Sequence, residues 1–193
     1  MKNELLTALY KRPETVFTLK DISLMFPDIS YVNLKKRMAY FAGKGGIKKI
    51  RRGIYVKDNY DVLELANKLY SPSYVSLETV LAKEGVVFQY YREIFLVSYL
   101  SRSLTVAGND LGYRKIKDEI LFNRRGIERI NQAEVATKER AFLDAVFLYK
   151  DYYFDNLRPL DWEKIEELKL IYNSKIFDKR INDYYQIYKT DNA

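Results

Sequence analysis

The pattern of apolar residues and glycines between Ser30 and Val56 places the tightest constraint on the fold. Beyond Ser30, a favoured helix N-cap residue, apolar side chains recur at helical spacing, at Tyr31, Leu34, Met38 and Phe41. A glycine-rich stretch at 43–46 then ends this helix, and two short β-prone runs follow on either side of Gly53. We therefore predict a helix of about three turns followed by a β-hairpin.

Two shorter helices are predicted ahead of this one. The first covers about residues 3–11, where leucines at positions 5, 6 and 9 share one face before Pro13. The second opens at Thr18, with Asp21 three residues later in a capping-box arrangement, and it follows a short extended piece at 15–17. Three helices and a hairpin in this order predict a winged helix-turn-helix domain over residues 1–58.

The excess positive charge lies entirely in this first part of the chain. Residues 1–58 hold 13 Lys and Arg against 5 Asp and Glu, a balance of +8, whereas residues 59–193 hold 20 against 21, a balance of −1. A compact module this basic attracts a polyanion, because each neutralised phosphate releases condensed counterions. A solvated basic surface that only aids solubility is the alternative interpretation.

The predicted third helix and hairpin carry side chains that suit DNA binding. In such a domain the third helix enters the major groove, where asparagine can bridge adenine and arginine or lysine can reach guanine. Cations on the hairpin suit phosphate contacts, which position the protein without reading sequence. The predicted DNA-binding residues are Ser30, Asn33, Lys35, Lys36, Arg37, Lys48, Lys49, Arg51 and Arg52.

Two features of this region also allow a structural interpretation. The cations of the hairpin are those that an edge strand uses to prevent strand-to-strand aggregation. Tyr31, in the apolar stripe, and Tyr40, on the polar face, are predicted to be packing residues rather than base contacts.

Residues 59–193 predict a separate α+β domain in which a small antiparallel sheet is flanked by helices. Helices are predicted at 61–69, 76–82, 138–148 and 162–171, and from 174 onward. Between them, β-prone runs separated by glycine-containing turns occupy 94–99, 103–107, 114–116, 120–123 and 127–130. Ser76 and Glu78 are predicted to cap the start of a helix rather than to act chemically.

Two charged groups in this second part are predicted to be structural. Arg140 and Asp144 are one helical turn apart, the separation of an ion pair on a helix rather than of a catalytic pair. Arg124, Arg125 and Arg129 form either a second basic site or ordinary surface ion pairs, and the glutamates beside them favour ion pairs.

The chain contains neither cysteine nor histidine, which excludes several kinds of site. The chain therefore cannot form a disulfide, a zinc site with thiolate or imidazole ligands, or a nucleophile activated by histidine. The glycine run at 43–46 lacks the spacing of a phosphate-binding loop. We therefore predict a protein that is not an enzyme and has no cofactor. Residues 1–10 lack a secretory signal pattern and no long apolar segment occurs, so a cytoplasmic protein without a membrane partner is predicted.

Several stretches of the chain resemble the AbiEi antitoxin family. They are the Arg-Gly-Ile-Tyr sequence at 52–55, Leu-Ala at 65–66, Ser-Pro-Ser-Tyr-Val-Ser-Leu-Glu-Thr-Val-Leu at 71–81 and Ala-Thr-Lys-Glu-Arg-Ala-Phe-Leu-Asp at 136–144. The Pro-Ser-Tyr-Val-Ser-Leu-Glu sequence at 72–78 and the Lys-Glu-Arg-Ala-Phe-Leu-Asp sequence at 138–144 are fairly specific in combination, in this order behind a winged helix. The resemblance does not extend to residues 89–133.

The resemblance implies a DNA-binding antitoxin of a type IV toxin-antitoxin, or abortive-infection, system. Such a protein represses its own operon by binding double-stranded operator DNA, and it opposes a nucleotidyltransferase-like toxin without necessarily forming a stable complex. A stand-alone winged-helix transcriptional regulator, whose second domain senses a ligand or dimerises, is the alternative. A nucleotidyltransferase or nuclease would need clustered metal-binding carboxylates that the sequence does not present.

Overall fold

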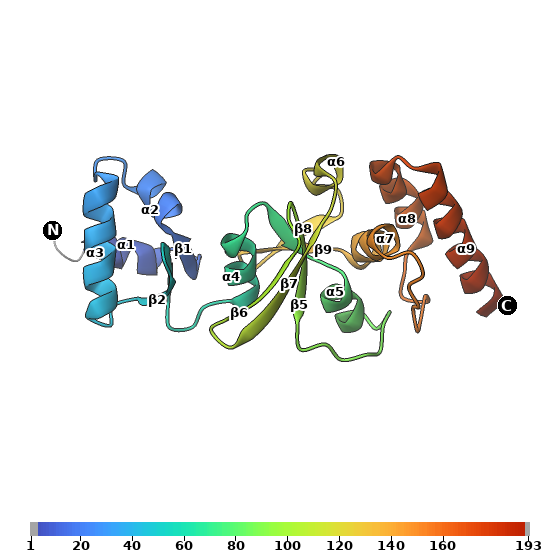
Figure 1. Ribbon diagram of the computed structural model, residues 1–193, viewed down its shortest axis with the longest axis horizontal. Helices are drawn as coiled ribbons and strands as arrows, with labels where there is room; N and C mark the ends of the chain where they lie inside the picture. Colours follow the sequence, from blue (N-terminus) through green and yellow to red (C-terminus); the bar gives the residue numbers. More distant parts are fainter. Residues whose placement is uncertain (1–3, 192–193) are drawn as a thin grey trace.

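The computed structural model describes residues 4–191, so Asn3 of the predicted first helix lies outside the described residues. The chain begins with three helices, α1 (Glu4–Lys11), α2 (Leu19–Met25) and α3 (Tyr31–Gly43), at one end of an elongated molecule (Figure 1). Three short strands accompany them: β1 (Val16–Thr18), β2 (Lys48–Arg51) and β3 (Ile54–Val56). These bounds agree closely with the helices and hairpin predicted from the sequence.

Local sequence features explain how these elements begin and turn. The Thr18 side chain accepts a hydrogen bond from the backbone of Asp21, and the Asp21 carboxylate accepts one from the Thr18 backbone, so the predicted capping box is confirmed. Gly53 adopts a φ of +78°, a conformation that favours glycine, in the turn between β2 and β3. Ser30 caps α3 as predicted.

The first three strands form an antiparallel sheet in the order β1-β3-β2. One face of this sheet packs on the three helices through Phe17 and Tyr55, which belong to a hydrophobic cluster with Leu9, Ile22 and Met38. The other face carries Val16, Ile54 and Val56, which belong to the larger core of the rest of the chain.

The second sheet is larger than predicted and mixed in strand direction. Its six strands run in the order β6-β7-β5-β4-β9-β8. They are β4 (Ser73–Val75), β5 (Ile94–Ser98), β6 (Arg102–Val106), β7 (Asn109–Lys115), β8 (Ile127–Ile130) and β9 (Ala133–Ala136). The prediction of a small antiparallel sheet is wrong, because two of the strand pairs are parallel. The strand β7 lies between β6, to which it is antiparallel, and β5, to which it is parallel, and β4 pairs in parallel with β9.

Individual strands also differ from the predicted ones. The first two residues of the predicted strand at 120–123 belong to the helix α6 (Asp118–Leu121) and the other two to no strand, and β4 and β9 were not predicted. The strand predicted at 114–116 is the end of β7, which begins at Asn109. Short apolar runs fit a buried helical turn and a buried strand equally well, and only pairing with a neighbouring strand separates the two.

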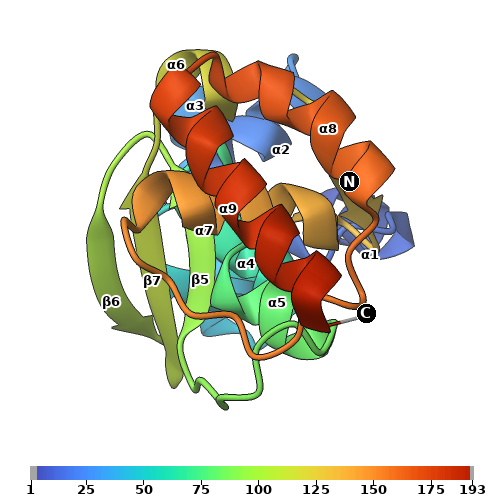
Figure 2. The ribbon, with the colours of Figure 1, turned by 90° about the vertical axis from the view of Figure 1, so that its right-hand side faces the viewer.

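Helices cover both faces of the second sheet. On the side nearer the first sheet lies α4 (Val62–Leu69), and on the other side lie α5 (Glu78–Lys83) and α7 (Lys138–Leu148) (Figure 1). Beyond α7 the chain adds α8 (Trp162–Lys169), a 3-10 turn (Leu170–Tyr172) and α9 (Lys175–Asp191), which lie over α7 at the far end of the molecule (Figure 2). No helix within residues 4–191 combines the length and apolar character needed to cross a membrane.

The two sheets are joined through a polar contact on α4. The Glu64 carboxylate is fully buried and accepts hydrogen bonds from the backbone N–H and the hydroxyl of Thr15, at 2.8 and 2.6 Å. Lys68 lies 3.1 Å from Asp21 and 3.6 Å from Glu64. These contacts hold the first three helices in one orientation relative to the second sheet.

Candidate nucleic-acid interface

The helix α3 divides its side chains between the core and solvent. Leu34, Met38 and Phe41 are buried in the cluster beneath it, as predicted. The predicted DNA-binding residues of this helix, Asn33, Lys35, Lys36 and Arg37, are all exposed. Ser30 is exposed as well, and its hydroxyl oxygen caps the helix by accepting a hydrogen bond from the Asn33 backbone at 3.4 Å.

Tyr31 is exposed and does not belong to the buried stripe in which it was predicted, whereas Tyr40 lies on the exposed face as predicted. Their exposed fractions are 56% and 55%, and Tyr40 contacts the edge of Phe41 at a ring separation of 5.9 Å. Tyr40 is ~100° around the helix from Phe41, which turns it away from the buried stripe. Tyr31 occupies the first position after the cap. Both rings therefore lie on the exposed surface of α3 with the cations.

The hairpin cations are exposed but point to two different faces. Lys49 is paired with Tyr55 across the strands, and directly paired residues share a face of the sheet, so Lys49 lies on the side of the three helices. Lys48 is paired with Val56 and Arg51 with Ile54, which places both on the opposite side. Arg52 is exposed in the turn that follows β2. The predicted group of four cations is thus divided by the register of the hairpin.

Most of these cations lack a carboxylate partner among the described residues. Lys48 forms an ion pair with Asp58 at 3.2 Å. Within residues 4–191 no ion pair involves the six other predicted cations, Lys35, Lys36, Arg37, Lys49, Arg51 and Arg52. Their charge is therefore not neutralised locally, and it produces a positive potential around α3 and the hairpin.

Sequence reasoning missed two further residues of the α3 surface. Val32 has an exposed fraction of 62%, and Ala39 is also exposed. At ~100° per residue both lie opposite the buried stripe, on the same line of the helix surface as Lys36. The spacing of Val32, Lys36 and Ala39 relative to the buried Leu34 is the sequence signal that could have placed these residues on the exposed face of the helix.

A second concentration of polar side chains is fully buried. Asp144 on α7 accepts hydrogen bonds from the hydroxyls of Tyr172, Ser76 and Tyr74, at 2.7, 2.8 and 3.2 Å. Arg140, one turn earlier, lies 3.4 Å from the same carboxylate, so the predicted helix ion pair is confirmed. The guanidinium also donates to the backbone oxygens of Ile120 and Arg125, at 2.7 and 2.9 Å.

The electrostatics of this cluster favour a charged guanidinium. Burial opposes its charge, but the Asp144 carboxylate and the hydroxyls of Tyr172 and Tyr74 raise the pKa of Arg140 above its ordinary value. Burial also raises the pKa values of Tyr74 and Tyr172. Every side chain in the cluster is 2% exposed or less, so no substrate reaches it and its role is structural.

Ser76 and Glu78 are not helix caps, contrary to the prediction. The residue at the cap position of α5 is Leu77, with a φ of +56°, and no side chain caps the helix there. Ser76 instead binds Asp144, and Glu78 is buried, with one carboxylate oxygen that has no hydrogen-bond partner among the described residues. The cross-strand pairing of β4 draws this segment into the core, which local capping rules do not anticipate.

The arginines at 124, 125 and 129 are occupied by local partners. Arg124 forms an ion pair with Glu134, and Arg129 donates to the side chain of Gln132. Arg125 donates to the backbone oxygen of Glu167 at 3.2 Å. Of the two interpretations of these residues, the structure favours local surface pairing.

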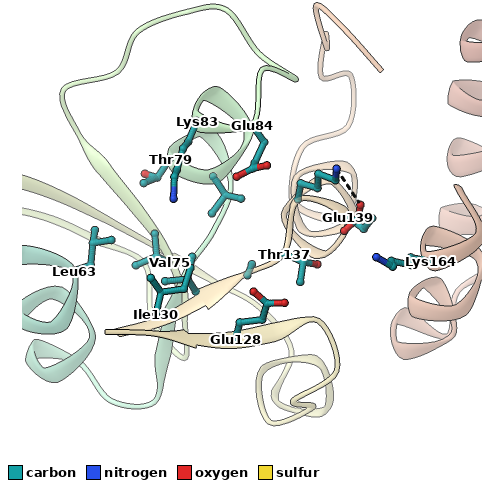
Figure 3. A pocket seen from close by; sticks show the side chains of 14 residues that line it. Leu63, Val75, Thr79, Lys83, Glu84, Glu128, Ile130, Thr137, Glu139 and Lys164 are labelled. Atoms are coloured by element: carbon teal, nitrogen blue, oxygen red, sulfur yellow. Dashed lines mark ion pairs between the residues drawn. The ribbon is translucent and has the colours of Figure 1, made fainter. Parts of the chain in front are cut away.

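A pocket of about 290 Å³ lies where α5, α7, α8 and the β8–β9 hairpin meet (Figure 3). Glu139, nearly buried, accepts a hydrogen bond from the backbone of Asp161 at 3.3 Å, and Lys164 points toward it from α8. The charged lining residues are three lysines and three glutamates: Lys83, Lys138, Lys164, Glu84, Glu128 and Glu139. This balance does not distinguish an anionic from a cationic ligand.

Comparison with models of known protein families and with curated proteins finds no match to this chain.

Proposed function

We propose that residues 1–58 form a winged helix-turn-helix that binds double-stranded DNA. The order of three helices and three strands, with the hairpin β2–β3 completed by β1 at its inner edge, supports this interpretation. The observation that carries the proposal is the exposed face of α3, where Asn33, Lys35, Lys36 and Arg37 meet solvent and none of the three cations has a carboxylate partner among the described residues.

In this arrangement α3 enters the major groove with its first turns near the base edges. Asn33 and Lys36 then face bases, while Lys35 and Arg37 reach the flanking backbone or a guanine. The Ser30 hydroxyl, already at the helix start, faces a phosphate. The hairpin approaches the neighbouring DNA backbone with Lys49 and Arg52. Lys48 and Arg51 lie on the opposite face of the hairpin.

A binding titration with paired variants tests this proposal. A labelled duplex from the region directly upstream of the protein's own gene is titrated with the whole chain and with the variant Lys36→Ala/Arg37→Ala. We expect an affinity loss of about tenfold or more, because two groove or phosphate contacts are removed. The variant Lys175→Ala/Lys179→Ala on α9 removes the same charge at the far end and is expected to bind normally. Equal affinity of both variants would contradict the placement of α3.

We propose further that the protein acts in the cytoplasm as the antitoxin of a type IV toxin-antitoxin system, without a catalytic site or cofactor of its own. It represses its own operon and opposes a nucleotidyltransferase-like toxin. Support comes from the residues that carry the family resemblance: Tyr74, Ser76, Arg140 and Asp144 come from both matching stretches and meet in one buried cluster. The two stretches therefore specify a common core.

A growth-rescue experiment separates the two activities of this proposal. The gene next to this one is expressed as the candidate toxin, together with the wild-type chain or with Lys36→Ala/Arg37→Ala. We expect both to restore growth while only the wild type represses a reporter of the operon promoter, because the substitutions lie on α3, at the opposite end of the molecule from α8 and α9, and leave residues 59–193 unchanged (Figure 1). Growth arrest that neither protein relieves would contradict the antitoxin role.

A stand-alone regulator with a ligand-sensing second domain is the alternative function, and the pocket of Figure 3 is the observation that favours it. In that case the adjacent gene has no effect on growth, and a pocket substitution such as Lys164→Glu changes repression without changing the affinity of the purified protein for DNA.

A further inference from the structure

The outermost line of α3 is partly apolar, although it faces solvent. Val32, Lys36 and Ala39 follow one another at intervals of four and three residues, directly opposite the buried Leu34 and Met38. The exposed fraction of Val32 is 62%, and the residues one turn farther along the helix from it are Lys35 and Lys36. Val32 is therefore an exposed aliphatic side chain in the first turn of α3, one turn from two lysines.

The stability of α3 does not explain a valine at this position. Valine is β-branched, loses side-chain freedom in a helix and is a weaker helix former than alanine, lysine or glutamine. It belongs to neither of the two hydrophobic clusters, and its exposed fraction is 62%. On the surface proposed to meet the major groove, this exposed valine is available for an apolar contact with DNA.

The major groove presents one apolar group at the edges of the bases, the 5-methyl group of thymine. The other groups along this edge are hydrogen-bond donors and acceptors, which a valine side chain cannot satisfy. Val32 lies in the first turn of α3, the part of such a helix that comes nearest the base edges. Asn33, the adjacent residue, has the amide that pairs with adenine.

We propose that Val32 contacts the 5-methyl group of a thymine in the DNA site. This inference rests on the proposed DNA-binding function and adds to it the chemical class of the base that α3 reads. The bound sequence then carries a T·A pair at the position of Val32, with an adenine available to Asn33 at a neighbouring position. Lys36 lies one turn farther along and holds the backbone or a guanine beside them.

The test removes the methyl group from the DNA and the side chain from the protein in turn. A pool of duplexes with a randomised centre is selected for binding to the whole chain, and the selected duplex is remade with deoxyuridine in place of each thymine, one at a time. Deoxyuridine pairs with adenine as thymine does but lacks the 5-methyl group. We expect one position at which the wild-type protein loses about fourfold in affinity, the effect of one buried methyl group.

The variant Val32→Ala identifies that position as the partner of Val32. We expect the variant to bind the thymine and deoxyuridine duplexes equally well there, and to retain its circular dichroism spectrum because Val32 is exposed. The control Leu170→Ala, also exposed at 69%, keeps the wild-type preference for thymine.

The outcomes separate this inference from the proposal on which it depends. Selection of a duplex without any methyl-sensitive position, or a preference for thymine that Val32→Ala retains at every position, overturns the thymine contact and leaves DNA binding intact. A pool from which the folded wild-type protein selects no duplex overturns DNA binding and the thymine contact together.

Discussion

Asp144 is the side chain that the other polar groups of the buried cluster bind. Its carboxylate receives three hydroxyl donors and the guanidinium of Arg140, from three different segments of the chain. Both members of the ion pair are fully buried. A pair of this kind contributes little net stability when intact, but removal of one partner leaves an uncompensated charge in the core.

We therefore predict that Asp144→Ala destabilises the protein by about 3–5 kcal/mol, the cost of leaving the buried guanidinium of Arg140 without its carboxylate. The free energy of unfolding in urea measures the effect. The control Glu166→Ala removes an exposed carboxylate that pairs with Lys169 and is expected to change stability by less than about 1 kcal/mol. A loss for Asp144→Ala no larger than that of the control would contradict the structural role of the cluster.

The buried carboxyl of Glu78 is expected to make the free energy of unfolding depend on pH. Burial raises the pKa of its carboxyl above the ordinary value of 4.5, although Tyr149, Arg114 and Tyr152 oppose the shift. Between the unfolded and the folded pKa, the folded protein holds a proton that the unfolded chain has released. Stability therefore falls as the pH rises from about 4.5 through the folded pKa.

The variant Glu78→Gln removes this titration. We expect its free energy of unfolding to exceed that of the wild type at pH 7.5, and the difference to shrink as the pH approaches 4.5. Urea unfolding of both proteins across this range provides the measurement. A difference that stays constant with pH would show that the Glu78 carboxyl titrates alike in the folded and unfolded chains.

At the scale of elements, the register of the β2–β3 hairpin decides which of its cations share the surface of α3. Lys49 lies on the side of the three helices, whereas Lys48 lies on the other side and pairs with Asp58. We predict that Lys49→Ala/Arg52→Ala weakens DNA binding similarly for all sequences and reduces the log–log salt slope by about one to two units, because each phosphate contact contributes about 0.9.

Lys48→Ala is the matched variant of this experiment. Its charge is already partly neutralised by Asp58, so we expect little change in the slope. Affinities measured at several salt concentrations compare the proteins. A larger effect of Lys48→Ala than of Lys49→Ala/Arg52→Ala would mean that DNA approaches the opposite face of the hairpin.

The helices and strands also differ in how well they could be predicted from the sequence. The helix predicted at 138–148 coincides with α7, because its cap at Thr137 and its apolar face are local features. The strand β4 and the helix α6 were missed or misassigned, because each is short and is decided by its neighbours: β4 by pairing with β5 and β9, and α6 by burial of Ile120 beside Arg140.

At the scale of the whole molecule, Glu64 couples the first three helices to the second sheet. It accepts both the backbone N–H and the hydroxyl of Thr15. We predict that Glu64→Ala leaves the Thr15 backbone N–H without an acceptor, whereas the Thr15 hydroxyl still accepts a hydrogen bond from the Asp61 backbone. The substitution is expected to lower the free energy of unfolding by about 1–3 kcal/mol and to speed hydrogen exchange at the Thr15 amide. Glu84→Ala, which removes an exposed glutamate, is the control. Unchanged exchange at Thr15 would contradict the coupling.

The sequence by itself determined the helices with strong periodicity and caps, the hairpin around Gly53, and the exposure of Asn33, Lys35, Lys36 and Arg37, because each of these depends on residues within a few positions of one another. Only the tertiary structure decided the order and direction of the six strands, the opposite faces of Lys48 and Lys49, and the burial of Ser76 and Glu78. Those features depend on contacts between residues far apart in the chain. Ser76 and Asp144 are 68 residues apart, a separation at which no local spacing reports a contact.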